Sequence, residues 1–394
     1  YKKGPKEYVV SINYPYILEK IKIDEYIYLY DGIIRAKVIE TNPKVKAEIE
    51  NSGTLSSRKG VNFPNTIIDI EVITKKDEAD IAWGVKNRVD YFAISFVQNA
   101  KDMRRARELL GDYKGKLIAK IEKFDAVSNI DEIIETSDGI MVARGDLGIE
   151  VPYYDVPTIQ KMLIKKSNAK GIPVITATQM LLSMTQNERA TRAEISDVAN
   201  AVLDGTDIVM LSEESAVGEN PVNVVETMHN IISQTEKIFD HEKRYKFTYL
   251  DEFDVIQATV TKLADDLSAD GILSLTSSGN SARKMSRYRP ITPLYTFAHD
   301  KETLTGLTAL WGVEPITTVK EAQASKMIQR MLRSLEKREI LNKKGLYICT
   351  VGYPVGIPGS TNTIKILTPS EIEFYLNFKE NREKIKTEKK VNLA

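Results

Sequence analysis

The sequence is poor in the side chains that form covalent cross-links or imidazole-based sites. Its 394 residues include one cysteine, Cys349, and three histidines, His229, His241 and His299, which are far apart in the chain. A single cysteine excludes a disulfide within the chain and favours a reducing compartment. With so few histidines, a histidine-rich zinc site or a Ser-His-Asp hydrolase is a poor hypothesis.

The sequence also lacks an excess of either charge and a long apolar run. Lys plus Arg and Asp plus Glu number 55 each, which argues against a mainly electrostatic nucleic-acid binder. No apolar run approaches the roughly 18–20 residues of a membrane span. Residues 1–20 do not have the basic-then-apolar order of a signal peptide. We therefore expect a cytoplasmic protein whose partners are neither nucleic acid nor membrane.

What the sequence does contain is the composition of a folded protein and a change of rhythm along the chain. Apolar residues make up 42% and charged residues 28%, as in globular domains. A typical size of roughly 100–200 residues per domain predicts two or three domains. Residues 1–62 combine β-prone runs such as Tyr26–Tyr30 with turn signals such as Asp31-Gly32, which predicts a small β-rich domain.

Two longer stretches, residues 63–240 and 241–369, alternate short apolar runs with amphipathic segments. This is the pattern of βαβ units on a parallel sheet. The first stretch has about five such units, so it is either an open sheet or part of a barrel that needs eight. The second stretch is typical of a separate open α/β domain. Residues 370–394 are rich in charged side chains, which predicts a solvated tail or a terminal helix.

A lysine and a glutamate, Lys120 and Glu122, stand at the end of the apolar run Lys116–Ile121. Side chains alternate between the two faces of a strand, so these two charges point the same way. Active sites of parallel α/β folds lie at the carboxyl ends of the strands, which makes the pair a candidate site. An ion pair that caps the strand is an equally good explanation of these two residues taken alone.

The next apolar run, Gly139–Ala143, leads into an acid flanked by glycines, Gly145-Asp146-Leu147-Gly148. Glycines let a ligand approach the backbone, and their free N–H groups bind anions. Glu122 and Asp146 follow successive strands, so both carboxylates can reach one Mg²⁺, which commonly binds two protein carboxylates together with water and substrate oxygens. The alternative, Asp146 as a helix N-cap, explains the acid but not both glycines.

Three further segments offer groups that suit anions. Thr178 follows a predicted strand and can donate its hydroxyl and N–H to a carboxylate or phosphate, although threonine also caps helices. Lys59 lies on the turn Ser56–Gly60, which can reach a polyphosphate, although a solvated turn is the better explanation of that segment alone. A hydroxyl-rich turn before a helical pattern can bind phosphate with its N–H and O–H groups; its residues are Thr276, Ser277, Ser278, Gly279, Asn280 and Ser281.

Together these segments resemble the pyruvate kinase family. The match is close along Gly139–Val151 and Thr176–Gly218, and it continues in Ser56–Pro64, Tyr288-Arg289-Pro290 and Gly352–Thr363. The resemblance implies a TIM-type (β/α)₈ barrel, incomplete here, with an inserted small β-barrel lid domain and a C-terminal open α/β regulatory domain. It also implies an enzyme that transfers a phosphoryl group from phosphoenolpyruvate to ADP, giving pyruvate and ATP in the last step of glycolysis.

The resemblance implies a role for each residue of the barrel site. Lys120 would stabilise the phosphoryl group during transfer, and Glu122 and Asp146 would hold Mg²⁺ or Mn²⁺. The backbone of Gly145 and Asp146, together with Thr178, would bind the substrate carboxylate. Thr178 or a water beside it is the candidate proton donor to the enolate carbon.

The resemblance extends to partners outside this site. Lys59 on the lid would meet the phosphates of ADP or ATP, and the turn Thr276–Ser281 would hold a phosphate of an allosteric effector, for which the family uses both sugar phosphates and nucleotides. Family members are typically homotetramers, and K⁺ is a cofactor of the family. The K⁺ ligands lie in a part of the family pattern that this chain does not contain.

The main departure from the family pattern is at the start of the chain. The segments Asn-Phe-Ser-His-Gly and Asp-Thr-Lys-Gly-Pro of the first barrel strands do not occur, and the chain begins with Tyr1. We therefore expect a fragment of a longer protein. Two alternatives stay open: a lyase or aldolase on a phosphoenolpyruvate-type barrel, or a non-catalytic metabolite-binding relative.

Overall fold

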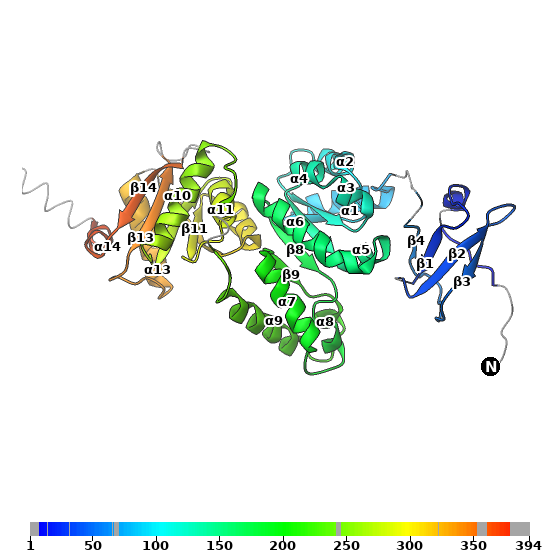
Figure 1. The fold of residues 1–394 in the computed structure, drawn as a ribbon. Helices are drawn as coiled ribbons and strands as arrows, with labels where there is room; N and C mark the ends of the chain where they lie inside the picture. Colours follow the sequence, from blue (N-terminus) through cyan, green and yellow to red (C-terminus); the bar gives the residue numbers. More distant parts are fainter. Residues whose placement is uncertain are drawn as a thin grey trace, which may run out of the picture. The chain divides into compact units, whose positions relative to one another are not determined.

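A computed structural model describes residues 8–13, 15–30, 32–64, 66, 71–241, 246–321, 323–352 and 361–378 (Figure 1). The chain forms two compact units, which we describe separately. Unit 1 comprises Tyr1–Leu163 and Thr176–Gln179, and unit 2 comprises Ile164–Ile175 and Met180–Ala394. The boundaries of the predicted lid, barrel, effector domain and tail stay predictions.

Unit 1 begins with a small antiparallel sheet, as the alternation in residues 1–62 predicts. Its strand order is β3-β2-β1-β4, and β2 pairs with both β1 and β3 in antiparallel register. Alternate residues of β2 are buried, so one face of the sheet packs against a short 3₁₀ helix in a core that includes Ile17, Val38 and Phe63. The elements are η1 (Pro15–Glu19), β1 (Tyr26–Leu29), β2 (Ile34–Glu40), β3 (Lys46–Ile49) and β4 (Val61–Asn62). Of the predicted turn, Asp31 lies outside the described residues, and Gly32 has a φ of +81°.

The rest of unit 1 is built from a parallel sheet and its helices. Strands β5, β6 and β7 pair in parallel, and every residue of β7 is buried. This is why β7 is a continuous apolar run rather than an alternating one. The elements are α1 (Lys75–Lys86), β5 (Tyr91–Ile94), α2 (Ala100–Leu110), β6 (Lys116–Ile121), α3 (Phe124–Ser128), α4 (Ile130–Thr136), β7 (Gly139–Ala143), α5 (Arg144–Glu150), η2 (Tyr153–Asp155) and α6 (Val156–Lys170). The residues of α6 from Ile164 onward belong to unit 2.

The strand order of this parallel sheet is β5-β6-β7-β8-β9. Strand β8 (Val174–Ala177) contributes its first two residues to unit 2 and its last two to unit 1. In unit 2, Met180, Met184, Val198 and Val224 form a core between the following helices. These elements are η3 (Leu182–Thr185), α7 (Arg192–Asp204), β9 (Ile208–Met210), α8 (Glu213–Ala216) and α9 (Pro221–Glu236).

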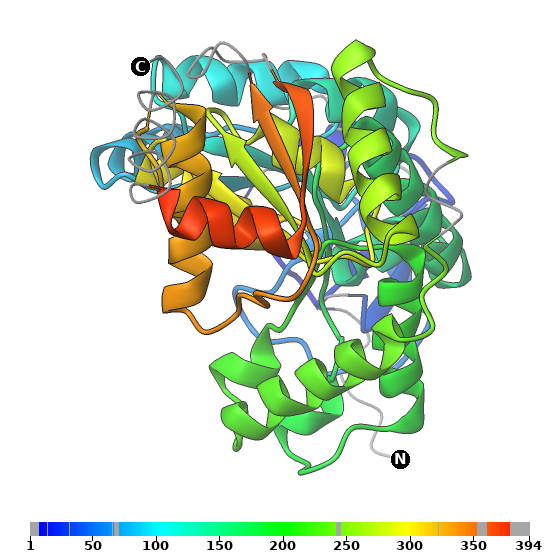
Figure 2. The same cartoon turned by 90° about the vertical axis from the view of Figure 1, so that its left-hand side faces the viewer.

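Unit 2 continues into a second sheet with the order β12-β11-β10-β13-β14, in which only β14 runs antiparallel to its neighbour. Successive strand residues point to opposite sides. Both faces of this sheet carry buried apolar residues, so helices cover both. Leu273 and Cys349 pack with α13 and α14, which lie in front of the sheet in Figure 2, whereas Ile272 and Ile348 pack with α10. The elements are α10 (Glu252–Asp266), β10 (Gly271–Thr276), α11 (Asn280–Ser286), β11 (Leu294–Ala298), α12 (Lys301–Gly306), η5 (Leu307–Ala309), β12 (Val313–Thr318), α13 (Ala324–Lys337), β13 (Tyr347–Gly352), β14 (Thr361–Leu367) and α14 (Pro369–Leu376).

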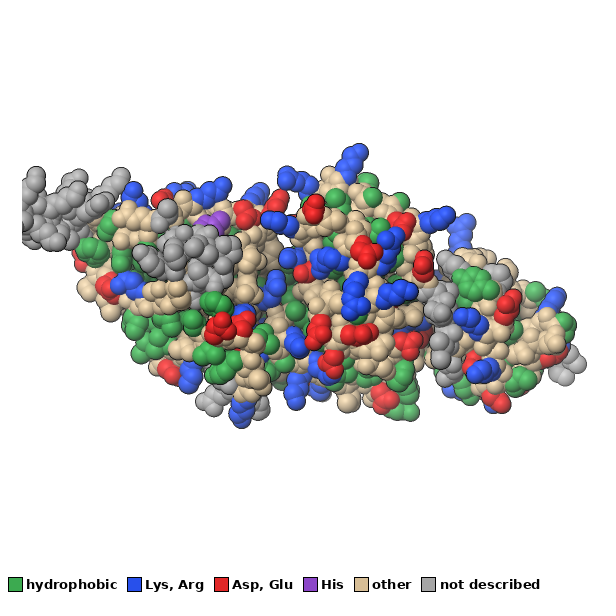
Figure 3. All heavy atoms as spheres, turned by 90° about the horizontal axis from the view of Figure 1, so that it is seen from above, with side chains coloured by type: hydrophobic (Ala, Val, Ile, Leu, Met, Phe, Trp, Pro, Cys, Tyr) green, Lys and Arg blue, Asp and Glu red, His purple; other side chains and the backbone are tan. Residues whose placement is uncertain are grey.

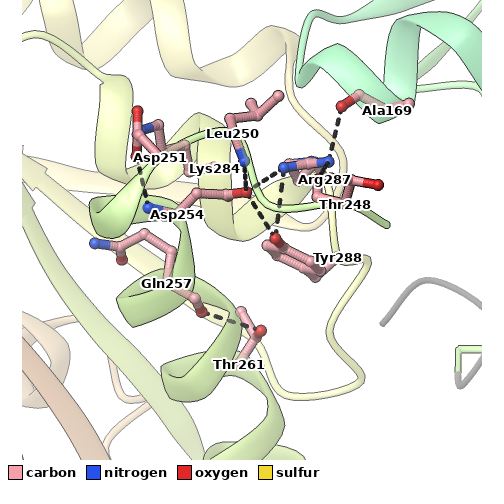
Figure 4. A network of polar contacts seen from close by, with 10 residues as sticks. All are labelled: Ala169, Thr248, Leu250, Asp251, Asp254, Gln257, Thr261, Lys284, Arg287 and Tyr288. Atoms are coloured by element: carbon pink, nitrogen blue, oxygen red, sulfur yellow. Dashed lines mark hydrogen bonds and ion pairs between the residues drawn. The ribbon is translucent and has the colours of Figure 1, made fainter. Parts of the chain in front are cut away.

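Buried charged side chains connect α10 and the residues after α11 to the end of α6 (Figure 4). Arg287 forms an ion pair with Asp254 and donates hydrogen bonds to the carbonyl oxygens of Ala169, at 2.7 Å, and Thr248, at 3.2 Å. Tyr288 donates its hydroxyl to the same carboxylate oxygen of Asp254 at 2.9 Å. The network fixes α11 against α10 and α6 within unit 2.

The predicted charged tail begins inside α14, where Ile372 and Leu376 are buried in the core; residues 379–394 lie outside the described part. On the face that Figure 3 shows, acidic and basic side chains are interspersed over the described surface, as expected for a zero net charge. None of the helices in the described ranges combines the length and the apolar character that crossing a membrane requires.

Candidate active site

The predicted site residues of the barrel lie just after neighbouring parallel strands of unit 1. Lys120 and Glu122 are at the end of β6, Gly145 and Asp146 follow β7, and Thr178 follows β8. Parallel strands present their carboxyl ends at one edge of a sheet, where α/β folds bind their ligands. The edge therefore brings together an ammonium group, carboxylates, a hydroxyl and backbone N–H groups.

Lys120 and Glu122 form the contact that strand alternation predicts. The Lys120 Nζ lies 2.7 Å from the Glu122 Oε1, and the Glu122 side chain is 1% exposed. Two residues after β5, which sequence reasoning missed, complete the arrangement. Lys120 donates to the Ser95 Oγ at 2.9 Å, and the Phe96 N–H donates to the Glu122 Oε2 at 2.6 Å. The only indication in the sequence was that a polar residue, Ser95, follows the apolar run of β5.

The electrostatics of Glu122 fit a cation beside it. Burial raises the pKa of Glu122 above its usual value and the negative charge of Asp146 adds to this, whereas Lys120 and the Phe96 N–H lower the pKa. Both oxygens of Glu122 have a partner, Oε1 the Lys120 ammonium group at 2.7 Å and Oε2 the Phe96 N–H at 2.6 Å. Two carboxylates that repel each other are a donor set that suits a hard divalent cation.

Asp146 does not occupy the N-cap position of helix α5, as the alternative explanation of this residue requires. Helix α5 begins directly after β7, with Ala143 as its N-cap, so Asp146 lies in the first turn and is not the cap. The capping alternative is therefore wrong. The Gly145 N–H donates to the Thr178 Oγ1 at 2.8 Å. This bond joins two of the residues that we expected around the substrate carboxylate.

Thr178 has an unusual backbone. Its φ is +71°, and the φ of the following Gln179 is +53°, a region that residues with a Cβ seldom adopt. The Thr178 hydroxyl donates to the Ala177 carbonyl at 2.6 Å, and the guanidinium of Arg144 donates to the Thr178 carbonyl at 2.8 Å. Sequence reasoning missed Arg144, whose only signal was its place beside Gly145.

Glu150 is a further acid that the sequence analysis did not select. It lies at the end of α5, four residues after Asp146, and its Oε1 accepts a hydrogen bond from Asn62 of β4 at 3.3 Å. Burial raises the pKa of Glu150, and the charges of Asp125 and Asp146 raise it further, against the effect of Lys123. The spacing of four residues on one helix was the available signal.

The other two predicted sites lie elsewhere in the chain. Lys59 is exposed, and its Nζ lies 4.1 Å from the centre of the Tyr30 ring. In unit 2 the turn between β10 and α11 contains all six predicted residues, Thr276, Ser277, Ser278, Gly279, Asn280 and Ser281. The Thr276 Oγ1 accepts the Gly279 N–H at 3.0 Å, and Gly279 has a φ of +84°. Ser278 and Asn280 are exposed, so this turn offers hydroxyl and amide groups to solvent.

No group of three or more His, Cys, Asp or Glu side chains with metal-binding geometry occurs in the part of the chain that the structure describes. The predicted metal pair, Glu122 and Asp146, has only two members. Mg²⁺ commonly binds two protein carboxylates, and water and substrate oxygens complete its octahedral shell.

The fold and the site define a class: an α/β protein with a charged site at the carboxyl edge of a parallel barrel-type sheet, a small β domain and a second open α/β sheet. A family model described as "Pyruvate kinase, barrel domain" matches residues 1–225, and one described as "Pyruvate kinase, alpha/beta domain" matches residues 254–367. The chain belongs to the pyruvate kinase family. This confirms the predicted family and fold class.

Curated relatives give the same result. The chain is 39% identical over 373 residues to a pyruvate kinase of Bacillus licheniformis and to one of Geobacillus stearothermophilus, covering 92% of this chain and 64% of each relative. It is 40% identical over 365 residues to a pyruvate kinase of Staphylococcus epidermidis, covering 90% of the chain and 62% of the relative. The chain thus spans less than two thirds of the length of these relatives.

Proposed function

We propose that this chain is the part of a pyruvate kinase that transfers a phosphoryl group from phosphoenolpyruvate to ADP, in the last step of glycolysis. In this reaction the bond between phosphorus and the enol oxygen breaks, and a bond forms from phosphorus to a β-phosphate oxygen of ADP. The enolate then takes a proton on carbon to give pyruvate. The main support is the ammonium group of Lys120 beside the buried Glu122 and near Asp146 at one sheet edge.

Lys120 is assigned to the phosphoryl group. Phosphoryl transfer needs little covalent help from the protein; it needs alignment and positive charge around the oxygens of the group in transit. Ser95 and Glu122 hold the ammonium group of Lys120 from two sides, at 2.9 and 2.7 Å. A lysine held in this way is ready to stabilise charge without reorganisation during the reaction.

Glu122 and Asp146 are assigned to Mg²⁺ or Mn²⁺. When bound, the cation would supply positive charge to the phosphate oxygens of phosphoenolpyruvate and ADP. Glu122 is fixed by the Phe96 N–H, and its pKa is raised by burial and by Asp146, so a cation relieves the mutual repulsion of the two carboxylates. K⁺ is proposed as a second cofactor on family grounds alone.

Gly145, Asp146 and Thr178 are assigned to the carboxylate of phosphoenolpyruvate. The Gly145 N–H donates to the Thr178 hydroxyl at 2.8 Å. A bound carboxylate competes for both donors, because a carboxylate is a stronger acceptor than a hydroxyl. We also assign proton delivery to the enolate carbon to Thr178, directly or through a water beside it.

The remaining assignments concern the nucleotide, regulation and assembly. Lys59 is assigned to the phosphates of ADP and ATP, and the turn Thr276–Ser281 to a phosphate of an allosteric effector. We further propose a homotetramer in the cytoplasm. None of these partners is a nucleic acid or a membrane.

The deciding experiment is pyruvate release from phosphoenolpyruvate in excess Mg²⁺, with and without ADP. It should be run on this chain and on a form extended upstream with the first barrel strands of a relative. Turnover that requires ADP supports the proposal. Turnover without ADP would favour a lyase or phosphatase relative, and a folded protein that turns over in neither form would favour the metabolite-binding alternative.

A further inference from the structure

Two consecutive residues of the proposed substrate-binding turn have left-handed backbone conformations without being glycine. The φ angles are +71° at Thr178 and +53° at Gln179. Threonine is branched at Cβ, which makes this region especially unfavourable for it. Such residues persist only where the surrounding structure holds them in place. The structure must therefore contain a group that fixes this turn.

The guanidinium of Arg144 is that group. Its Nε donates to the Ala177 carbonyl at 3.3 Å, and its Nη2 donates to the carbonyls of Thr178 at 2.8 Å and Gln179 at 3.4 Å. Three successive carbonyl oxygens thus face one planar donor. A guanidinium has five N–H groups in a fixed plane, which is the geometry that several acceptors on one turn require.

The same side chain is held from α6 as well. The Arg144 Nη1 donates to the Oε1 of Gln160 at 3.3 Å, and Gln160 is only 4% exposed. This contact orients the guanidinium plane toward the turn. The turn at residues 177–179 then sets the place of the Thr178 hydroxyl, which accepts the Gly145 N–H at 2.8 Å and donates to the Ala177 carbonyl at 2.6 Å.

We propose that Arg144 is a positioning residue, which sets the place of the Thr178 hydroxyl beside Gly145 by holding the carbonyls of residues 177–179. This inference rests on the proposed function, because it gives Arg144 its role through Thr178. Lysine cannot replace it: an ammonium group is a compact point donor and does not reach three carbonyls from one plane. The positive charge of Arg144 is therefore not what the site needs from it.

The test uses Arg144→Lys and Arg144→Gln, with Arg107→Lys as the matched control. Arg107 is a comparable arginine in unit 1 that donates to the Gly115 carbonyl at 3.2 Å and to Asp138 at 2.5 Å. A small misplacement of a reacting group costs about 100-fold in rate. We expect kcat/KM for phosphoenolpyruvate to fall by about this factor in both Arg144 variants, with KM for ADP unchanged, and neither change in Arg107→Lys.

A second measurement does not depend on turnover. Hydrogen exchange of the Gly145 amide reports on its bond to the Thr178 hydroxyl. We expect this amide to exchange at least about tenfold faster in Arg144→Lys than in the unaltered protein, because exchange follows local opening. In Arg107→Lys its exchange should stay at the original rate. If neither this chain nor its upstream-extended form has activity, the proposed function fails, and this measurement still decides whether Arg144 positions the turn.

Two results would overturn the proposal. One is Gly145 exchange in Arg144→Lys at the rate of the unaltered protein, which would show that the turn keeps its conformation without the guanidinium. The other is retention of kcat/KM for phosphoenolpyruvate in Arg144→Lys together with its loss in Arg144→Gln, since positive charge alone would then suffice. That second pattern would make Arg144 a direct contact of the substrate anion.

Discussion

At the scale of single residues, the pair formed by Lys120 and Glu122 is better explained by chemistry than by stability. The Glu122 side chain is 1% exposed and that of Lys120 is 25% exposed. Taking two charges out of water costs several kcal/mol per ion, and their attraction often does no more than repay it. A strand end that needed only a cap would be served as well by uncharged residues. The arrangement therefore suits a site that needs an ammonium group at a fixed point.

The first prediction concerns Lys120→Met. We expect kcat to fall by about 10³-fold, the scale of one lost electrostatic stabiliser, while Tm in Mg²⁺ changes little because the cation then compensates Glu122. Steady-state kinetics and a thermal melt check this. Lys116→Met is the control, since it removes a lysine from the other end of β6, where its ion pair with Asp138 is 3.6 Å long. Near-normal turnover in Lys120→Met would remove this lysine from the mechanism.

The residues of the site differ in how far the sequence predicts them. Strand periodicity alone places Lys120 and Glu122 on one side, and their contact of 2.7 Å follows. The bond between Gly145 and Thr178 joins residues 33 positions apart, which periodicity does not predict. The left-handed backbone at Thr178 also has no signal, because neither it nor Gln179 is a glycine. Such features depend on tertiary contacts such as those of Arg144.

At the scale of elements, β6 is fixed at its beginning by an aspartate that precedes β7. The Asp138 Oδ2 accepts the Leu117 N–H at 2.8 Å and a hydrogen bond from Arg107 of α2 at 2.5 Å. Burial alone would raise the pKa of Asp138, but the hydrogen bonds from Arg107 and Leu117 and the charge of Lys116 outweigh it and hold the pKa below its usual value. The strand that ends in Lys120 thus begins at a fixed point.

The second prediction concerns Asp138→Asn. We expect the free energy of unfolding at pH 7 to fall by about 1–3 kcal/mol, the cost of weakening hydrogen bonds to a partly buried charged acceptor. The folded-state pKa of Asp138 is lowered, so its stabilisation is fully present above the unfolded pKa and is lost as pH falls through the folded pKa. The difference between variant and unaltered protein should therefore shrink below about pH 4.

Urea unfolding at several pH values measures this difference. Asp112→Asn is the control, because Asp112 is exposed on the loop before β6 and surface substitutions usually change stability by less than about 0.5 kcal/mol. A difference that does not depend on pH would mean that the shape of Asp138 matters and its charge does not.

Some helices and strands have strong local signals in the sequence, and others have none. The apolar runs Lys116–Ile121 and Gly139–Ala143 are β6 and β7 with the predicted bounds. The amphipathic pattern of residues 241–369 gives helix α13 over Ala324–Lys337, and the chain turns soon after it at Glu339, whose φ is +61°. Strand β14 was not predicted, because it joins the edge of the sheet as its one antiparallel strand.

At the scale of the whole molecule, the arginines of the segment Arg287-Tyr288-Arg289 anchor α11 within unit 2. Arg289 donates to the Asn168 Oδ1 at 2.6 Å, the Gly205 carbonyl at 2.9 Å and the Asp207 Oδ2 at 2.9 Å. Its side chain is 2% exposed and that of Asp207 is 3% exposed. Burial lowers the pKa of Arg289, against the charge of Asp207. The helix that follows the predicted effector turn thus ends in contact with the segments on both sides of β8.

The third prediction concerns Arg289→Met. Removal of one partner of a buried ion pair leaves the other charge uncompensated, and we expect a loss of about 3–5 kcal/mol in the free energy of unfolding. The double variant with Asp207→Asn should recover part of this loss, because the uncompensated carboxylate is then absent. Arg330→Met is the control, since its ion pair with Glu321 is exposed and 3.8 Å long. Urea unfolding of the four proteins provides the comparison, and equal losses for Arg289→Met and Arg330→Met would contradict the prediction.

The anchoring of α11 leads to the last prediction, which concerns coupling between the proposed effector turn and the proposed active site. Allostery is a coupling free energy between two sites and has to be measured as one. Ser281 lies in the first turn of α11, where an added carboxylate is compatible with the helix but repels a bound phosphate. In Ser281→Asp we therefore expect the activation ratio, turnover with effector divided by turnover without it, to fall toward one. Ribose 5-phosphate, glucose 6-phosphate and AMP are suitable probes, and Ser281→Asn is the uncharged control. An activation ratio in Ser281→Asp equal to that of the control would place the regulatory phosphate elsewhere in the chain.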